Sequence, residues 1–176
     1  MYDNNEIESR YQMFVYKTKY FGEFAANEDD KQIVIETKTN ITGIEQEISI
    51  IMDIENIIDV KDYCIKILDD YKKIYEKGKM ALETENKEKG SLVTYLQKIH
   101  KRYGEEMFSK LSGMKWITKR NITEIINKMD APDIRIEIKG GKVKVNLVYE
   151  ISKEVEEMIG VRMDKRYGVE GITYYE

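Results

Sequence analysis

The single histidine and the single cysteine, His100 and Cys64, are the residues best suited to zinc binding or nucleophilic catalysis. A zinc site of the Cys/His type needs three or four ligands, and one residue of each kind cannot supply them. A histidine-assisted nucleophile needs a recognisable motif, and neither residue lies in one. We therefore interpret His100 as a structural or surface side chain and Cys64 as a small buried apolar residue. The sequence predicts no catalytic, metal-binding or cofactor-binding residue.

The chain contains 33 acidic residues, which leave a carboxylate or carboxylate–tyrosine active site, with magnesium, as an alternative. Three acidic runs stand out, namely Glu28-Asp29-Asp30, Asp69-Asp70 and Glu156-Glu157. The first run lacks the spaced ligands and the turn glycine of a calcium loop, so we interpret it as a solvated turn. The other two are interpreted as exposed helix faces.

Aromatic composition gives a stronger functional hint, because 13 tyrosines stand against only 4 phenylalanines. Tyrosine combines an apolar ring with a polar tip and is enriched at protein interfaces. The candidate partner-binding residues are Tyr11, Tyr16, Tyr20, Trp116, Tyr174 and Tyr175. The alternative interpretation is that these tyrosines line the margins of a small sheet.

The elements that must position these side chains begin with a β-hairpin in residues 134–151. Apolar residues alternate with polar ones on both sides of Gly140-Gly141, which favours a type I′ turn. No helix and no Gly-Lys-Ser/Thr sequence follows the glycines, so they do not form a phosphate loop. The turn predicts the pairs Lys139 with Lys142, Ile138 with Val143, Ile136 with Val145 and Ile134 with Leu147. This register gives a sheet with one buried face.

Further strands are predicted near both ends of the chain. Residues 11–24 predict one strand or two short ones, and alternation around Ile35 and Ile50 predicts a second pair. The last strand pair is expected at 161–163 and 169–175.

Helical periodicity dominates the middle of the chain. A helix is predicted from an N-cap at Asp59 to about Leu82, with its apolar stripe formed by Val60, Cys64, Ile67, Tyr71, Ile74 and Gly78. Ser91 is expected to cap a second helix that ends at Ser112-Gly113. Asn121 and Glu124 predict a capping box for a short third helix, and Ser152 predicts one or two helical turns that close at Gly160.

Strands that come first and last, with helices between them, predict an α+β fold. We expect an antiparallel sheet of hairpins, with two long helices and one or two short helices packed on one face. Residues 1–10 are predicted to form a polar N-terminal lead-in, and residues 11–176 a single domain.

This layout resembles an uncharacterised bacterial family, the domain of unknown function numbered two-thousand-and-four, together with its relatives. The resemblance is carried by the run Tyr20-Phe21-Gly22-Glu23-Phe24, the acidic turn, the two strands and the amphipathic helix. It is carried further by the strand at 142–149, Glu150-Ile151 and the closing Gly171-Ile172-Thr173-Tyr174-Tyr175. The resemblance covers the chain from about Tyr20 onward and implies a fold. It implies no catalytic residues.

Charge and composition narrow the function classes. The net charge is −4 with a pI near 5.3 and interspersed signs, which disfavours binding to nucleic acid. The lone cysteine fits a reducing cytoplasm, and no stretch predicts a signal peptide or a membrane span. We expect a non-enzymatic cytoplasmic domain that binds a protein, such as a toxin-neutralising immunity or accessory protein with a basic toxin as partner. The alternatives are the carboxylate–tyrosine enzyme and a structural module that forms a homodimer.

Overall fold

Alternating apolar side chains build the hairpin at the centre of the sheet. The computed structural model describes residues 13–27, 31–55, 57–104, 117–151 and 155–175. In it, β5 (Asp133–Lys139) pairs antiparallel with β6 (Lys142–Glu150), in the predicted register from Lys139 opposite Lys142 onward. Gly140 and Gly141 have φ values of 55° and 69°, as a type I′ turn requires. The register predicted from the sequence is confirmed.

Among the described residues, six strands form the main sheet, in the order β3-β4-β5-β6-β7-β8. The other four strands are β3 (Gln32–Thr39), β4 (Gln46–Ile54), β7 (Met158–Met163) and β8 (Val169–Tyr175). All pairings in this sheet are antiparallel except that of β4 with β5, which is parallel. The helices lie between these two strands in the chain, and a crossover of that kind lets the second strand run in the same direction as the first.

The first two strands form a separate hairpin. β1 (Met13–Thr18) and β2 (Gly22–Asn27) pair only with each other in the described part of the chain. The hairpin packs on the helices, because the Phe21 ring lies edge-on to the Tyr71 ring with the centroids 5.0 Å apart. Of the two alternatives predicted here, one strand or two short ones, the structure has the two short strands, and the second extends beyond Phe24 to Asn27.

Four helices are described, α1 (Ile57–Asp69), α2 (Tyr71–Glu88), α3 (Ser91–Tyr103) and α4 (Ile122–Lys128). The single helix predicted from Asp59 to about Leu82 is therefore wrong in three respects: it begins at Ile57, it is divided at Asp70, and its second part continues to Glu88. The Asp70 N–H donates to the main-chain oxygens of both Lys66 and Ile67, which closes α1 with a tight final turn. The break lets α2 take its own direction, starting from the fully buried Tyr71.

The predicted caps also differ from those observed. Ser91 is the first residue of α3, and the cap position is taken by Gly90 with a φ of 74°. Asn121 does precede α4, but its side chain makes no cap hydrogen bond; its Oδ1 accepts from the Thr118 N–H at 2.8 Å. The capping box is replaced by a turn that Asn121 stabilises ahead of the helix. The second helix ends at Tyr103, where the N–H of the capping Gly104 donates to the main-chain oxygen of His100 at 2.9 Å, so the prediction that it continues to Ser112-Gly113 is wrong. Ser112 and Gly113 themselves lie outside the described residues.

The short helix predicted before Gly160 is also wrong. Met158, Ile159 and Gly160 belong to β7, where Ile159 lies opposite Tyr149. The alternate residues Ile159, Val161 and Met163 are all fully buried. Because this burial has a period of two, the strand prevails over the helical spacing of the same apolar residues. Ser152, the predicted cap, lies outside the described residues.

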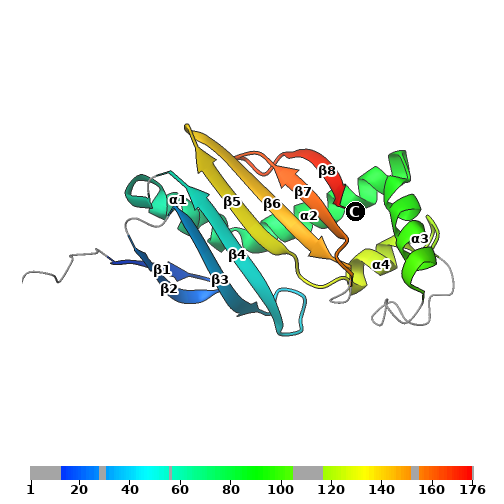
Figure 1. Cartoon of the computed structure of the whole chain (residues 1–176), viewed down its shortest axis with the longest axis horizontal. Coiled ribbons are helices and arrows are strands. Elements are labelled where there is room, and N and C mark those ends of the chain that lie inside the picture. The colour runs from blue at the N-terminus through cyan, green and yellow to red at the C-terminus, as the bar shows by residue number, and fades with distance from the viewer. Residues whose placement is uncertain (1–12, 28–30, 56, 105–116, 152–154, 176) are drawn as a thin grey trace, which may run out of the picture.

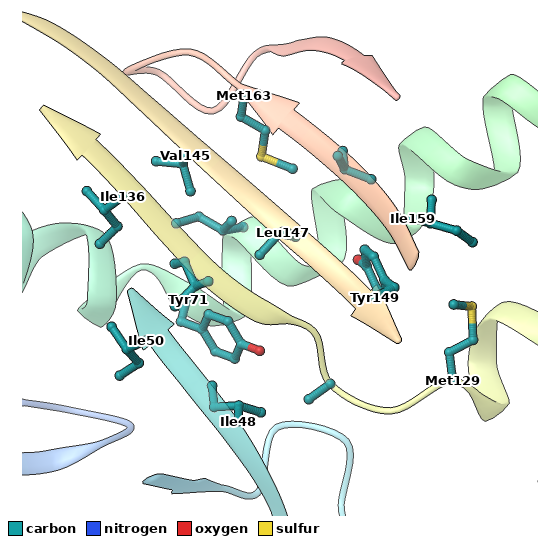
Figure 2. Close-up of a cluster of buried hydrophobic side chains, with 14 of the residues drawn as sticks. Ile48, Ile50, Tyr71, Met129, Ile136, Val145, Leu147, Tyr149, Ile159 and Met163 are labelled. Carbon is teal, nitrogen blue, oxygen red and sulfur yellow. The ribbon is translucent and has the colours of Figure 1, made fainter. Parts of the chain in front are cut away.

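The sheet has one covered and one open face, as the fold prediction requires. Figure 1 shows α2 crossing behind the strands, α3 and α4 at one end of the molecule, and the β1–β2 hairpin at the other. Figure 2 shows the apolar layer along the covered face, with Tyr71 and Tyr149 among the aliphatic side chains. The labelled strand residues of that layer are Ile48, Ile50, Ile136, Val145, Leu147, Tyr149, Ile159 and Met163, and all are at most 1% exposed. The α+β architecture is confirmed.

Candidate functional site

A groove of about 770 Å³ lies between α2 and the edge strand β8. We call it the α2–β8 groove. Its helical wall is built from residues spaced three or four apart on one side of α2, including Lys77, Ala81 and Glu85. Its other wall is β8, which is the last strand in the sheet order. A helix and a sheet edge that lie side by side thus enclose the hollow.

The middle of the groove is apolar. Met80 is 65% exposed and Val169 is 44% exposed, so each presents an apolar side chain to solvent. Ile172 and Tyr174 lie opposite the buried residues Val161 and Ile159 of β7, which puts both on the helix-covered side of the sheet. The groove therefore offers apolar surface from the helix and from the strand.

Tyr167 closes one end of the groove in a strained conformation. Its φ of 62° is the only positive φ at a non-glycine residue in the described part of the chain, and such a conformation persists only where the surroundings impose it. The Tyr167 hydroxyl donates to Asp70 Oδ2 at 2.9 Å, at the junction of α1 and α2. Lys73 and Lys77 lie over the ring, 5.4 and 5.9 Å from its centroid. Burial, and then the hydrogen bond to Asp70, raise the pKa of Tyr167.

The turn that precedes β8 is fixed by the side chain of Asp164, which lies in the turn, and by Lys77 of α2. Asp164 Oδ1 accepts from the N–H groups of Gly168 and Arg166, and these bonds lower the pKa of Asp164. Lys77 Nζ donates to the main-chain oxygen of Tyr167 at 3.0 Å. These contacts fix the start of β8 against α2, so this end of the groove is preformed and holds the ammonium group of Lys77.

Carboxylates mark the other end. Glu85 Oε2 accepts from the Leu92 N–H at 3.3 Å, which satisfies a free donor in the first turn of α3. Burial, and then the facing Glu85 carboxylate, raise the pKa of Tyr174. Glu88 is exposed one turn further along α2, and Lys89 follows it. Two carboxylates and one ammonium group thus line this end.

The predicted partner-binding residues do not form one surface. Tyr174 lines the groove, with its ring centroid 4.8 Å from that of Tyr95. Tyr175 is 40% exposed, and its ring lies against Gly160. At the opposite end of the molecule (Figure 1), Tyr20 is half-buried, and Tyr16 is stacked on Phe24 with no exposed surface for a partner to contact. Tyr11 and Trp116 lie outside the described residues.

The acidic runs are less exposed than their sequence suggests. Glu157 is only 3% exposed and accepts from Arg102 Nη1 at 2.6 Å and from the Tyr103 hydroxyl at 3.0 Å. Asp69 and Asp70 are half-buried; Asp69 Oδ1 accepts from the Lys19 N–H at 2.7 Å. The prediction of exposed helix faces is wrong for these three residues, because tertiary hydrogen bonds hold them in place. Glu156 is exposed, but like Glu157 it lies in a segment that is neither helix nor strand, so it is not on the predicted helix face. Glu28-Asp29-Asp30 lies outside the described residues.

The two residues that could act as nucleophile or base lie apart from the groove lining. Cys64 is fully buried in α1, as predicted, and burial raises its pKa to about 12. A thiol with that pKa supplies almost no thiolate near neutral pH. His100 is half-buried in the last turn of α3. Neither residue is among those that line the groove.

A second hollow, of about 400 Å³, includes side chains from the open face of the sheet. Arg135, Asn146 and Arg162 form a row across β5, β6 and β7, and Arg162 is paired with Glu170. Asp53 and Glu137 also line this hollow, together with Lys144. Because its lining mixes charges of both signs, it does not indicate one class of ligand.

The exposed Met80 is the sequence signal that sequence reasoning missed. It is an apolar residue that lies off the buried stripe of its helix, on a side otherwise covered by charged residues. Its proximity to β8 could not be predicted locally, because α2 and β8 are far apart in the chain.

Comparisons with known proteins add no relative. No family model, no curated protein and no solved structure matches the chain. The resemblance to the bacterial family of unknown function therefore stays a prediction. Within the described residues, no group of three or more His, Cys, Asp or Glu side chains is placed to hold a metal ion. None of the described helices has the length and apolar content to span a bilayer.

Proposed function

We propose that this chain is a non-enzymatic protein-binding domain and that the α2–β8 groove is its binding surface. The observation that carries the proposal is the apolar hollow beside a sheet edge, with Met80 and Val169 exposed on its two walls. Apolar surface of this kind, rimmed by charged residues, is typical of a site for another protein. Tyr174 adds an aromatic side chain of the type that anchors interfaces.

We further propose that the partner is basic and that the domain acts as a toxin-neutralising immunity or accessory protein in the cytoplasm. The support is the net charge of −4 and the carboxylates of Glu85 and Glu88 at one end of the groove. Complementary charge accelerates the encounter of two proteins and excludes partners of the wrong sign.

A matched pair of valine variants tests the binding surface. Val169 on β8 and Val34 on β3 are both exposed valines on the two edge strands, 44% and 57% exposed. A partner identified by affinity capture is purified, and its affinity is measured by calorimetry for the wild type, Val169→Arg and Val34→Arg. We expect Val169→Arg to weaken binding at least about tenfold and Val34→Arg to leave it unchanged. Equal affinity of all three proteins would refute the groove as the binding surface.

Light scattering on the same samples tests the alternative homodimer. A monomer at micromolar concentration agrees with the proposal. A stable dimer that Val169→Arg dissociates would assign the groove to a second copy of this chain and overturn the proposal of a foreign partner.

A further inference from the structure

Strand β8 ends the sheet, and its outer edge has no strand partner in the described part of the chain. Proteins usually protect such an edge with charged residues or proline. The opposite edge strand, β3, carries both Glu36 and Lys38, whereas the seven residues of β8 include only one charge, on Glu170. Glu170 is drawn back toward β7 by its ion pair with Arg162 at 3.3 Å. The β8 edge is thus the less protected of the two.

α2 runs alongside this edge, so the α2–β8 groove forms a slot that can hold an extended chain against β8. Lys77 contacts Tyr167, just before β8 begins, and Glu85 faces Tyr174, near its end. Helix and strand therefore run the same way, with the groove between them. A chain added to β8 would point alternate side chains toward α2, where Met80 and Val169 supply apolar contact.

Charge along the slot is polarised. Of the charged residues that line the groove, Lys77 lies at the Tyr167 end, where the charge of Glu170 is compensated by its ion pair with Arg162. At the other end, the carboxylates of Glu85 and Glu88 outnumber the single ammonium group of Lys89. At about 1.5 Å per helical residue, Lys77 and Glu88 are separated by roughly 16 Å along the helix. An extended chain covers that length in about five residues. The slot therefore matches a segment with opposite charges about four to six residues apart.

We propose that the groove binds an extended segment of a partner protein, which adds to the sheet as an antiparallel strand beside β8. Antiparallel pairing is slightly more stable per residue than parallel pairing. In that direction the N-terminal part of the segment lies beside Glu85 and Glu88 and carries a basic side chain. Its centre carries apolar side chains at alternate positions, and its C-terminal part carries an acidic side chain beside Lys77. This assignment rests on the proposed function and specifies the partner's segment.

A second copy of this chain does not meet this charge pattern. Self-pairing through β8 would present the sequence VEGITYY to the groove of the other copy. That sequence contains no basic residue to face Glu85 and Glu88. The charge pattern therefore favours a segment of a different protein.

Synthetic peptides test the proposal directly by fluorescence polarisation. The probe is a capped, labelled heptapeptide, Lys-Thr-Val-Thr-Val-Thr-Glu, and the matched control has Lys and Glu exchanged. We expect the probe to bind about tenfold more tightly than the control, because the control places like charges together at both ends. Two N-methylated forms of the probe are made, one methylated at the odd-numbered amides and the other at the even-numbered amides. One of the two forms should not bind, because its methyl groups remove the amide hydrogen bonds to β8.

Variants of the groove give the reciprocal test. Glu88→Lys should weaken the binding of the probe and strengthen the binding of the charge-exchanged peptide. Val169→Arg should weaken the binding of both peptides. Val34→Arg, on the other edge strand, should change neither. In NMR spectra, the amide signals of Val169–Tyr175 should shift when the probe is added.

The results that would overturn this inference are distinct from those that would overturn the proposed function. Strand addition is refuted if the probe does not bind, or if the charge-exchanged control binds equally well. It is also refuted if both N-methylated forms of the probe bind as tightly as the probe itself. The protein-binding role would still stand if Val169→Arg weakens the binding of the purified partner. If the partner binds Val169→Arg normally, the proposed function falls, whatever the peptides do.

Discussion

The Tyr149 hydroxyl of β6 lies directly over Gly78 of α2, where an added Cβ would sit 2.5 Å from the hydroxyl oxygen. A second atom, Leu147 Cδ1, would be 2.6 Å from the same Cβ. Both strand residues are at most 1% exposed, so neither can swing out to solvent. Gly78 is therefore what allows the helix to approach the sheet closely at this point.

Gly78→Ala should destabilise the protein in spite of its better helix propensity. Overpacking costs about 1–3 kcal/mol, against a propensity gain of at most about 1 kcal/mol, so we expect a net loss of about 1 kcal/mol in urea unfolding. The propensity gain is calibrated at the exposed Glu76 of the same helix, by comparing Glu76→Gly with Glu76→Ala. Adding Tyr149→Phe should restore part of the loss. A Gly78→Ala protein more stable than the wild type would contradict this packing.

Tyr71→Phe and Tyr149→Phe should have different effects, although both tyrosines are buried. The Tyr71 hydroxyl donates to the main-chain oxygen of Pro132 at 2.7 Å, and removing it leaves a buried acceptor unpaired. We expect a loss of about 1–2 kcal/mol. The Tyr149 hydroxyl has no hydrogen-bond partner among the described residues, so its removal should change stability by less than about 0.5 kcal/mol or increase it. Chemical denaturation of the two variants checks the contrast, and equal losses would rule it out.

The strands were predictable where burial has a period of two on one face. In β5 and β6, a one-residue slip would move Ile136 and Val145 to the open face, so the sequence determines the register as well as the strands. The prediction was wrong before Gly160, because Val155, Met158 and Ile159 also fit a helical spacing in a short segment. For short apolar runs the two periods are hard to distinguish.

Features that depend on contacts between distant segments were not predictable. The apolar stripe runs from Cys64 through Tyr71 without interruption, so nothing local indicates the break at Asp70. That break accompanies the hydrogen bonds of Asp70 with Tyr167 and of Tyr71 with Pro132. The parallel pairing of β4 with β5 and the α2–β8 groove also depend on contacts between segments that are far apart in the chain. Tyr174 could be chosen from the sequence as a candidate partner-binding residue, but the hollow that it lines could not be predicted.

Ile67→Asp should abolish cooperative folding. Ile67 is 1% exposed in α1, and a carboxylate buried there without a partner costs several kcal/mol of a total stability of typically about 5–15 kcal/mol. Lys66→Asp introduces the same side chain at the exposed neighbouring position and should cost less than about 1 kcal/mol. Thermal melting followed by circular dichroism compares the two variants. A cooperative transition of Ile67→Asp near that of the wild type would show that this side of α1 is not buried.

Alkaline pH should destabilise the folded state through its buried phenols and its thiol. Burial raises the pKa of Cys64 to about 12 and holds the pKa values of Tyr71 and Tyr149 well above their usual range. The unfolded chain loses these protons near pH 8.5 for Cys and pH 10 for Tyr, while the folded chain retains them. The folded state therefore binds more protons, and the free energy of unfolding falls as the pH rises.

The fall should begin near pH 9 and become steeper above about pH 10, and urea unfolding at a series of pH values measures it. Each buried phenol contributes up to about 1.4 kcal/mol per pH unit, so Tyr149→Phe should make the slope above pH 10 shallower by about that amount. Val34→Thr is the control, because it changes an exposed residue without removing or adding a phenol or thiol and should leave the slope unchanged. A stability that stays constant from pH 8 to pH 11 would mean that these phenols and the Cys64 thiol ionise as freely in the folded chain as in the unfolded one.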